Sequence, residues 1–217
     1  MRTNICFHGI GTCRVEREPG ESRYWVAEDE FRRMLDVVVD RDDVRLSFDD
    51  GNRSDADVAL PLLLERGLRA DVFALAGRLE DPASLDASDL KRLHAAGMRV
   101  GSHGWGHVPW RRLDPRAAQR EFQEARAALT EAVGVAVDTA AMPLGRYDRR
   151  TLEGLRTAGY RTVFSSDRFP ARPEAWLQAR YSVTASDTAE TIAALLARRP
   201  GLPEARNIAV SIVKRMR

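Results

Sequence analysis

The chain has 217 residues, of which 44% are hydrophobic and 30% charged, a composition typical of a globular protein with a sizeable core. Its 34 basic and 32 acidic residues give a formal net charge of +2, which argues against a general nucleic-acid-binding surface. Cys6 and Cys13 are too few for a disulfide framework, and we expect both to be reduced. We predict a single domain over residues 1–217.

The N-terminus has no long apolar segment and no small-residue cleavage site, so nothing in it predicts a secretory signal. No apolar run approaches the length of a membrane span. These features predict a cytoplasmic protein without a membrane span. The basic segment 213–217 is expected to be a frayed, solvated chain end, with weak contact to a membrane surface as the alternative.

Strands and helices alternate along the sequence. A strand over residues 4–8 ends at His8 and is followed by a turn at Gly9 and Gly11, then by a polar loop over residues 12–24. Further strands are expected at residues 44–48, 70–76, 98–101, 139–142, 161–164 and 179–183, and helices at 27–39, 56–66, 88–96, 114–133, 147–158 and 188–197. This alternation indicates parallel βαβ units, in a closed barrel or in an open doubly wound sheet.

Two adjacent carboxylates, Asp49 and Asp50, follow the strand at residues 44–48. Side chains of consecutive strand residues point to opposite faces, so the two carboxylates serve different roles unless a turn redirects one of them. Asp-Asp-Gly is also ordinary turn chemistry. In βαβ folds, functional groups gather at the carboxyl ends of the strands, where His103 and His107 also follow a strand.

The His-x-x-x-His spacing brings two imidazoles to one side of a turn, close enough to bind one divalent ion. One carboxylate completes three protein ligands and leaves a position open, as in catalytic zinc and non-haem iron sites. A bound cation lowers the pKa of its water to about 7, which makes hydroxide available to attack an acyl carbonyl. The carboxylate that is not a ligand can take the proton that this water loses. We predict a divalent metal, with Zn²⁺ favoured and Co²⁺, Ni²⁺ or Fe²⁺ as alternatives. Two solvated turns are the alternative without metal.

Three stretches resemble the first three motifs of the NodB-type polysaccharide deacetylases (carbohydrate esterase family four). They are Ser47-Phe48-Asp49-Asp50-Gly51, Ser102-His103-x-x-x-His107 and Met142-Pro143-Leu144-Gly145, and the similarity extends from about Arg23 to Leu196. The resemblance implies a deformed (β/α)7 barrel that hydrolyses N-acetyl, less often O-acetyl, groups on sugars. It implies Asp49 as the general base and Asp50, His103 and His107 as the metal ligands.

The sequence departs from this family pattern in three places. Ala141 stands where the third motif usually has an arginine that helps to orient the base, and Leu144 stands where an aromatic residue is common. No Leu-x-His motif follows residue 183, although the family usually takes its general acid from there. If the barrel is circularly permuted, the first strand takes the closing position, and His8 becomes the candidate general acid.

Several residues near the motifs are candidate substrate contacts. Trp105, Trp110 and Tyr147 could stack on a sugar ring, although each could equally pack the rim. Pro143, Leu144 and Gly145 would form the groove wall, and Arg146 could bind an anionic group.

The sequence predicts a metal-dependent deacetylase whose partner is an acetylated sugar, glycan or glycan precursor. One alternative keeps the site but hydrolyses another carbon–nitrogen bond, in a formamide or cyclic amide. The other alternative is a metal-binding pseudoenzyme. Ala141 and the absent C-terminal histidine favour the pseudoenzyme, whereas Asp49 argues against it because a protein that only binds metal has no need of a base.

Overall fold

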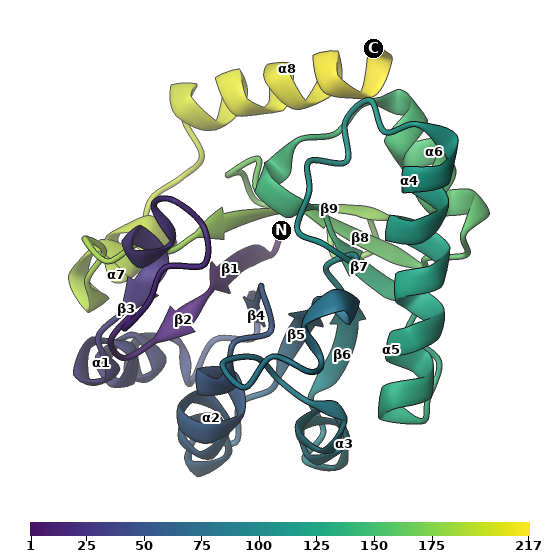
Figure 1. Ribbon diagram of the computed structural model, residues 1–217. Helices are drawn as coiled ribbons and strands as arrows, with labels where there is room; N and C mark the ends of the chain where they lie inside the picture. Colours follow the sequence, from purple (N-terminus) through teal and green to yellow (C-terminus); the bar gives the residue numbers. More distant parts are fainter.

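The computed structural model describes residues 1–217, and its centre is a closed barrel of seven parallel strands. Around the barrel the strands follow the order β1 (Thr3–Phe7), β4 (Val44–Phe48), β5 (Ala70–Ala74), β6 (Arg99–Ser102), β7 (Thr139–Ala141), β8 (Thr162–Ser165) and β9 (Leu177–Ser182). Helices cover its outside (Figure 1). The predicted (β/α)7 barrel is therefore confirmed, and the open doubly wound sheet is excluded.

Eight α-helices connect or follow these strands. Their bounds are α1 (Glu28–Val38), α2 (Leu60–Glu65), α3 (Ala87–Ala95), α4 (Pro115–Gln119), α5 (Ala125–Val133), α6 (Arg149–Thr157), α7 (Ala189–Ala197) and α8 (Leu202–Met216). A π-helical turn over Arg120–Glu124 joins α4 to α5, so the helix predicted over residues 114–133 is continuous. No helix is both long and apolar enough to cross a membrane.

The first strand closes the barrel. β1 pairs with β4, where Phe7 lies opposite Phe48, and with β9, where Cys6 lies opposite Ser182. Because all these strands are parallel, the residues that follow β1 and β4 emerge at the same rim. His8 and Asp49 therefore become neighbours, and β1 closes the barrel between β9 and β4.

Apolar side chains fill the space between the strands and the surrounding helices. Phe31 of α1 is fully buried, and its ring meets Phe7 edge-on at 5.0 Å and Phe48 at 5.9 Å between centroids. Phe7 and Phe48 stack at 5.6 Å. This aromatic cluster holds α1 against the two strands that lead to His8 and Asp49.

Some local predictions were wrong. Gly9 does not begin a turn. With Ile10 it forms a two-residue strand, β2, that pairs with β3 (Trp25–Val26). A Cβ atom at Gly9 would lie 2.2 Å from the Trp25 ring, so glycine permits this close approach. Segment 213–217 is not a frayed end, because residues up to Met216 belong to α8.

Replacing Phe31 with alanine removes the ring that packs against both strands. We expect Phe31→Ala to lower the free energy of unfolding by about 3–5 kcal/mol, since it deletes a fully buried aromatic side chain and leaves a cavity. Denaturant unfolding followed by circular dichroism measures this loss. The control, Leu64→Ala, changes a side chain that is 43% exposed and is expected to cost much less. Equal losses for the two variants would contradict this description of the core.

Candidate active site

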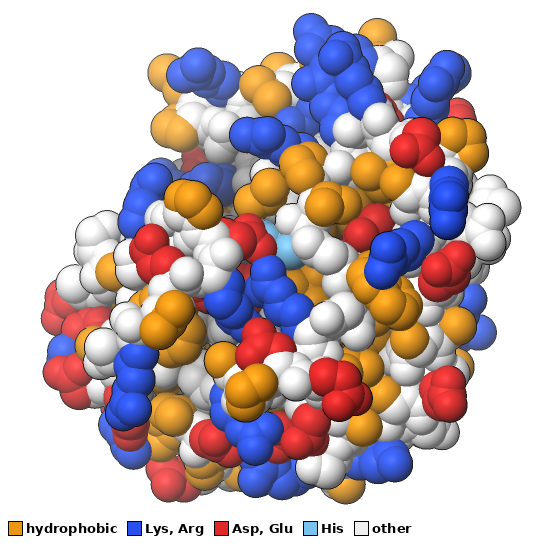
Figure 2. Space-filling model, in the orientation of Figure 1, with side chains coloured by type: hydrophobic (Ala, Val, Ile, Leu, Met, Phe, Trp, Pro, Cys, Tyr) orange, Lys and Arg blue, Asp and Glu red, His pale blue; other side chains and the backbone are white.

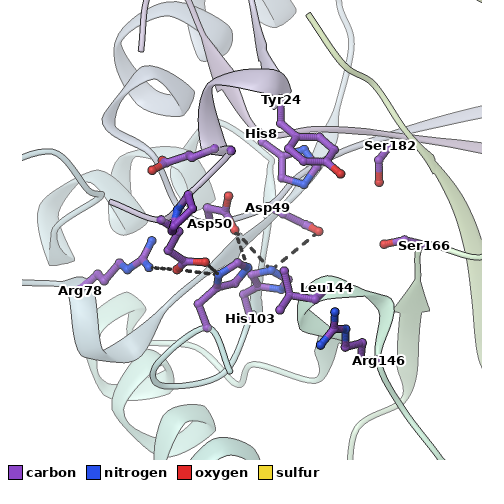
Figure 3. Close-up of a pocket in the computed structure, with 15 residues that line it drawn as sticks. His8, Tyr24, Asp49, Asp50, Arg78, His103, Leu144, Arg146, Ser166 and Ser182 are labelled. Atoms are coloured by element: carbon purple, nitrogen blue, oxygen red, sulfur yellow. Dashed lines mark hydrogen bonds and ion pairs between the residues drawn. The ribbon is translucent and has the colours of Figure 1, made fainter. Parts of the chain in front are cut away.

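The carboxyl ends of the barrel strands surround one pocket of about 280 Å³ (Figure 3). Its lining comprises His8, Glu18, Pro19, Gly20, Glu21, Tyr24, Asp49, Asp50, Arg78, His103, His107, Leu144, Arg146, Ser166 and Ser182. The loop predicted over residues 12–24 thus lies at the pocket and forms part of its wall. This volume is at the small end for ligand pockets, which hold about 300–1,000 Å³.

Asp50, His103 and His107 form a group that could hold a metal ion, with ligand atoms all within 4.8 Å of one another. Asp50 Oδ1 lies 3.4 Å from His103 Nε2 and 3.3 Å from His107 Nε2. Asp50 has a left-handed backbone with φ of 71°, the turn that redirects its carboxylate after β4. Although Asp50 Oδ1 is buried, no donor in the protein hydrogen-bonds to it.

The opposite nitrogens of the two imidazoles have acceptors of their own. His103 Nδ1 lies 2.9 Å from the Ala141 carbonyl oxygen, and His107 Nδ1 lies 2.6 and 2.7 Å from the Glu18 carboxylate oxygens. These acceptors favour the tautomer with the proton on Nδ1, which leaves both Nε2 lone pairs facing Asp50. Two imidazoles and the Asp50 carboxylate, whose buried Oδ1 has no hydrogen-bond donor, fit a catalytic divalent-metal site with an open position.

A second group, formed by Cys6, His8 and Asp49, also has its ligand atoms within 4.8 Å of one another. It suits a metal poorly. Burial raises the pKa of the Cys6 thiol well above its usual value, so the thiolate that metals bind is disfavoured. Both Asp49 oxygens already accept hydrogen bonds from Arg180.

The Asp49 carboxylate is held by a bidentate ion pair. Arg180 of β9 donates from Nη1 to Oδ1 at 2.7 Å and from Nη2 to Oδ2 at 2.6 Å. Both side chains are buried, and Arg180 has no exposed surface. Burial alone would raise the pKa of Asp49, but the guanidinium outweighs it and lowers the pKa to about 2. Asp49 is therefore ionised throughout the neutral range.

Arg180 supplies from β9 the charge that the family pattern places at position 141. Ala141 is fully buried and packs with Phe73 and Phe164. The Arg180 guanidinium lies over these same rings, 5.3 and 5.5 Å from their centroids. Sequence reasoning missed Arg180, and the available signal was an arginine in a strand that is otherwise mostly apolar and buried.

His8 follows β1 and faces the same pocket. Its ring lies 4.7 Å from the Tyr24 ring, and its buried Nδ1 has no hydrogen-bond partner in the protein. A ring nitrogen lies within 4.8 Å of an Asp49 oxygen. Burial lowers the pKa of His8, so its protonated form would give up a proton readily. His94, by contrast, is exposed on α3 and does not line the pocket.

Two glutamates support the histidine segment, and sequence reasoning missed both because they come from distant segments. Glu18 accepts from His107 and also pairs with Arg78. Glu121 is buried and accepts from the backbone amides of Trp105 at 2.8 Å and Gly106 at 3.1 Å. Glu121 therefore fixes the backbone between His103 and His107.

The structure separates the candidate substrate contacts into two sets. Leu144 and Arg146 line the pocket. The remaining candidates do not line it. Tyr147 is buried, and its hydroxyl donates a hydrogen bond to Asp167 at 2.6 Å. Trp105 packs against the core, and Arg120 lies over its ring. Pro143 is buried, and Gly145 lines a neighbouring hollow. Trp110 is also buried, in a core cluster with Phe122. A stacking role for these three aromatic side chains therefore does not fit this arrangement, because their rings are used in packing.

A family model described as polysaccharide deacetylase matches residues 36–163, more than half of the chain. The chain therefore belongs to the polysaccharide deacetylase family, a family of hydrolases. The curated protein YxkH of Bacillus subtilis, whose name places it among polysaccharide deacetylases, is 23% identical over 143 residues. That match covers 66% of this chain and 51% of YxkH, so the chain spans about half the length of this relative.

Solved structures share the fold. The Streptococcus pyogenes deacetylase PplD, in complex with acetate, is similar with a TM-score of 0.74 at 18% identity, over 92% of this chain and 98% of PplD. IcaB from Ammonifex degensii is similar with a TM-score of 0.74 at 24% identity, over 90% of this chain and 97% of IcaB. These similarities support the NodB-like barrel.

We expect the purified protein to bind about one divalent ion per chain, because three ligand atoms converge and one position stays open. His103→Ala removes a buried ligand and is expected to reduce metal content to background, as measured by mass spectrometry. His94→Ala is the matched control, since it deletes an exposed histidine that does not line the pocket. Equal metal content in the two variants would contradict this assignment.

Proposed function

We propose that the protein is a metal-dependent hydrolase that removes N-acetyl, or O-acetyl, groups from a sugar, glycan or glycan precursor. One observation carries the proposal: the Asp49 carboxylate, held by Arg180, lies beside the group formed by Asp50, His103 and His107, with His8 in the same pocket. A divalent cation, with Zn²⁺ favoured by this donor set, would supply Lewis acidity and make hydroxide available near neutral pH.

The proposed roles of the side chains follow from their positions. Asp49 is ionised and both of its oxygens are fixed, so it accepts the proton of the attacking water without reorienting. His8 donates a proton to the leaving amine or alcohol. Arg180 is a positioning residue, because it contacts Asp49 and does not line the pocket.

The pocket favours a small acetylated substrate, which is the acyl donor of the reaction. Residues 18–21 narrow it on one side, and Leu144 and Arg146 lie on its wall. Ser166, Ser182 and Tyr24 offer hydroxyl groups to a sugar, and Arg146 offers a cation to a phosphate or carboxylate on it. We propose that a single acetylated sugar unit, free or at the end of a larger molecule, enters the pocket.

The pseudoenzyme alternative loses its main support. It was favoured by Ala141 and by the absent C-terminal histidine. The structure has a guanidinium on Asp49 and an imidazole in the pocket, although they come from Arg180 and His8. Hydrolysis of a formamide or cyclic amide would use the same groups, and no observation favours it.

Acetate release from a panel of N-acetylated sugars tests this function. We expect the metal-loaded protein to release acetate and Asp49→Asn to slow release by about 10²–10⁴-fold with metal content retained, because the variant loses the base alone. Metal binding without acetate release from any member of the panel would contradict the proposal.

His8→Ala is expected to lower kcat by about 10²-fold or more on N-acetyl substrates, because expulsion of an amine requires a proton donor. Metal content should be unchanged. His94→Ala again serves as the control and should keep full activity. If His8→Ala turns over at the wild-type rate with its metal intact, His8 is not the general acid.

Arg180→Ala leaves the Asp49 charge buried and unpaired. We expect a loss of about 3–5 kcal/mol in the free energy of unfolding and a drop in kcat with little change in KM. Adding Ala141→Arg to this variant should restore part of the lost stability and part of the lost kcat, since position 141 packs against the rings that Arg180 covers. Arg180→Lys keeps the charge but not the bidentate geometry, so its kcat and free energy of unfolding should lie between those of the wild type and of Arg180→Ala. Wild-type turnover in Arg180→Ala would contradict a positioning role.

A further inference from the structure

The C-terminal helix α8 presents its polar face to the protein. Its inward positions are Glu204, Asn207, Ser211 and Lys214, which recur at the spacing of one helical face. Glu204 and Ser211 are buried, and the other two are partly buried. The helix thus reverses the usual arrangement, in which the apolar face packs on the core.

Specific hydrogen bonds fix this orientation. Lys214 Nζ donates to Asp167 Oδ1 at 2.6 Å and to the Gly145 carbonyl oxygen at 3.1 Å. The Ser211 and Tyr147 hydroxyl oxygens lie 2.9 Å apart, and Asn207 Nδ2 donates to the Arg168 carbonyl oxygen at 3.1 Å. These bonds pair the inward polar groups with partners in the rest of the protein, so they hold the helix with its polar face inward.

The outward face is apolar and exposed. Thirteen large hydrophobic side chains of the chain are exposed, and six of them lie on this one helix. They are Leu202 (87%), Ile208 (41%), Val210 (47%), Ile212 (47%), Val213 (43%) and Met216 (74%). Concentration of apolar surface on one element marks an interaction site, whereas scattered single residues do not.

The charge around this face has one sign. Residues 198–217 contain five arginines and one lysine, and their one acidic side chain is Glu204. Arg198 pairs with Glu204 and Lys214 pairs with Asp167. The other four arginines, at positions 199, 206, 215 and 217, have no carboxylate partner. Figure 2 shows basic and hydrophobic side chains together along the edge that α8 occupies. A second copy docked on this face would bring like charges together, whereas an anionic surface would neutralise them.

We infer that the outer face of α8 docks on an anionic lipid bilayer. An exposed apolar helix face flanked by cations lies in the plane of such an interface, with its apolar side chains at the boundary between headgroups and acyl chains. Anionic headgroups attract the arginines that flank the face. The helix lies on the surface and does not span it, in agreement with its length and composition.

The position of α8 links this surface to the pocket. Lys214 binds the carbonyl group of Gly145, whose two neighbours, Leu144 and Arg146, line the pocket. Docking would bring that side of the pocket to the lipid surface. This further step rests on the proposed function: the substrate class would be an acetylated sugar carried on a membrane lipid.

Co-sedimentation with vesicles tests the docking. We expect the full chain to bind vesicles of phosphatidylglycerol and phosphatidylcholine, to bind pure phosphatidylcholine much less, and to dissociate at high salt. Ile212→Gln with Val213→Gln should reduce the partition coefficient by about tenfold or more, because it removes apolar surface from the interface. Arg206→Gln with Arg217→Gln should reduce binding to anionic vesicles alone.

The matched control is Leu64→Gln with Val135→Gln, two side chains of similar exposure away from α8, and it should leave binding unchanged. Absence of binding to anionic vesicles would overturn the proposal. A dimer in light scattering that Ile212→Gln with Val213→Gln dissociates would overturn it in favour of a second copy. Acetate release from a water-soluble substrate, without vesicles, should be equal in all these variants. Vesicle binding without any acetate release would refute the proposed function and leave the docking surface standing.

Discussion

The ion pair between Arg180 and Asp49 is the interaction on which the rest of the site depends. A buried charge pair stabilises a fold only when its geometry compensates for the lost hydration, and here two short hydrogen bonds join a guanidinium and a carboxylate. Arg180 also donates to Ser47 Oγ at 3.0 Å, so β9 is tied to β4 across β1. The same side chain therefore links two strands on either side of β1 and fixes the Asp49 carboxylate.

Strained backbone and distant segments shape the neighbouring group that we propose as the metal site, Asp50, His103 and His107. Asp50, His107 and Leu144 all have positive φ values, which cost energy in residues other than glycine and are common at functional sites. Glu18 and Glu121 stabilise the histidine segment from opposite directions of the sequence. Because Glu18 belongs to the loop at the pocket, the segment that narrows the pocket also orients His107.

Local sequence patterns predicted the features of the fold and of the site that depend on neighbouring residues in the chain. Alternating strands and helices gave the βαβ repeat, and the Asp49-Asp50 and His103/His107 stretches marked strand ends that the barrel brings to one rim. Arg180 and Glu18 could not be predicted in this way, since each acts on a partner that only the tertiary fold brings near. Tyr147 and Trp105 looked like platforms, but core packing and Asp167 occupy them. The α8 helix was missed because its apolar face points outward, where no core pattern applies.

A crystal structure of the zinc-loaded protein, with anomalous scattering at the zinc edge, tests the central claim most directly. We expect one ion bound to an Asp50 oxygen and to Nε2 of His103 and His107, at about 2.0–2.2 Å, with Asp49 still paired to Arg180. An ion bound instead among Cys6, His8 and Asp49, or no ion at either position, would contradict the assignment of ligand and base.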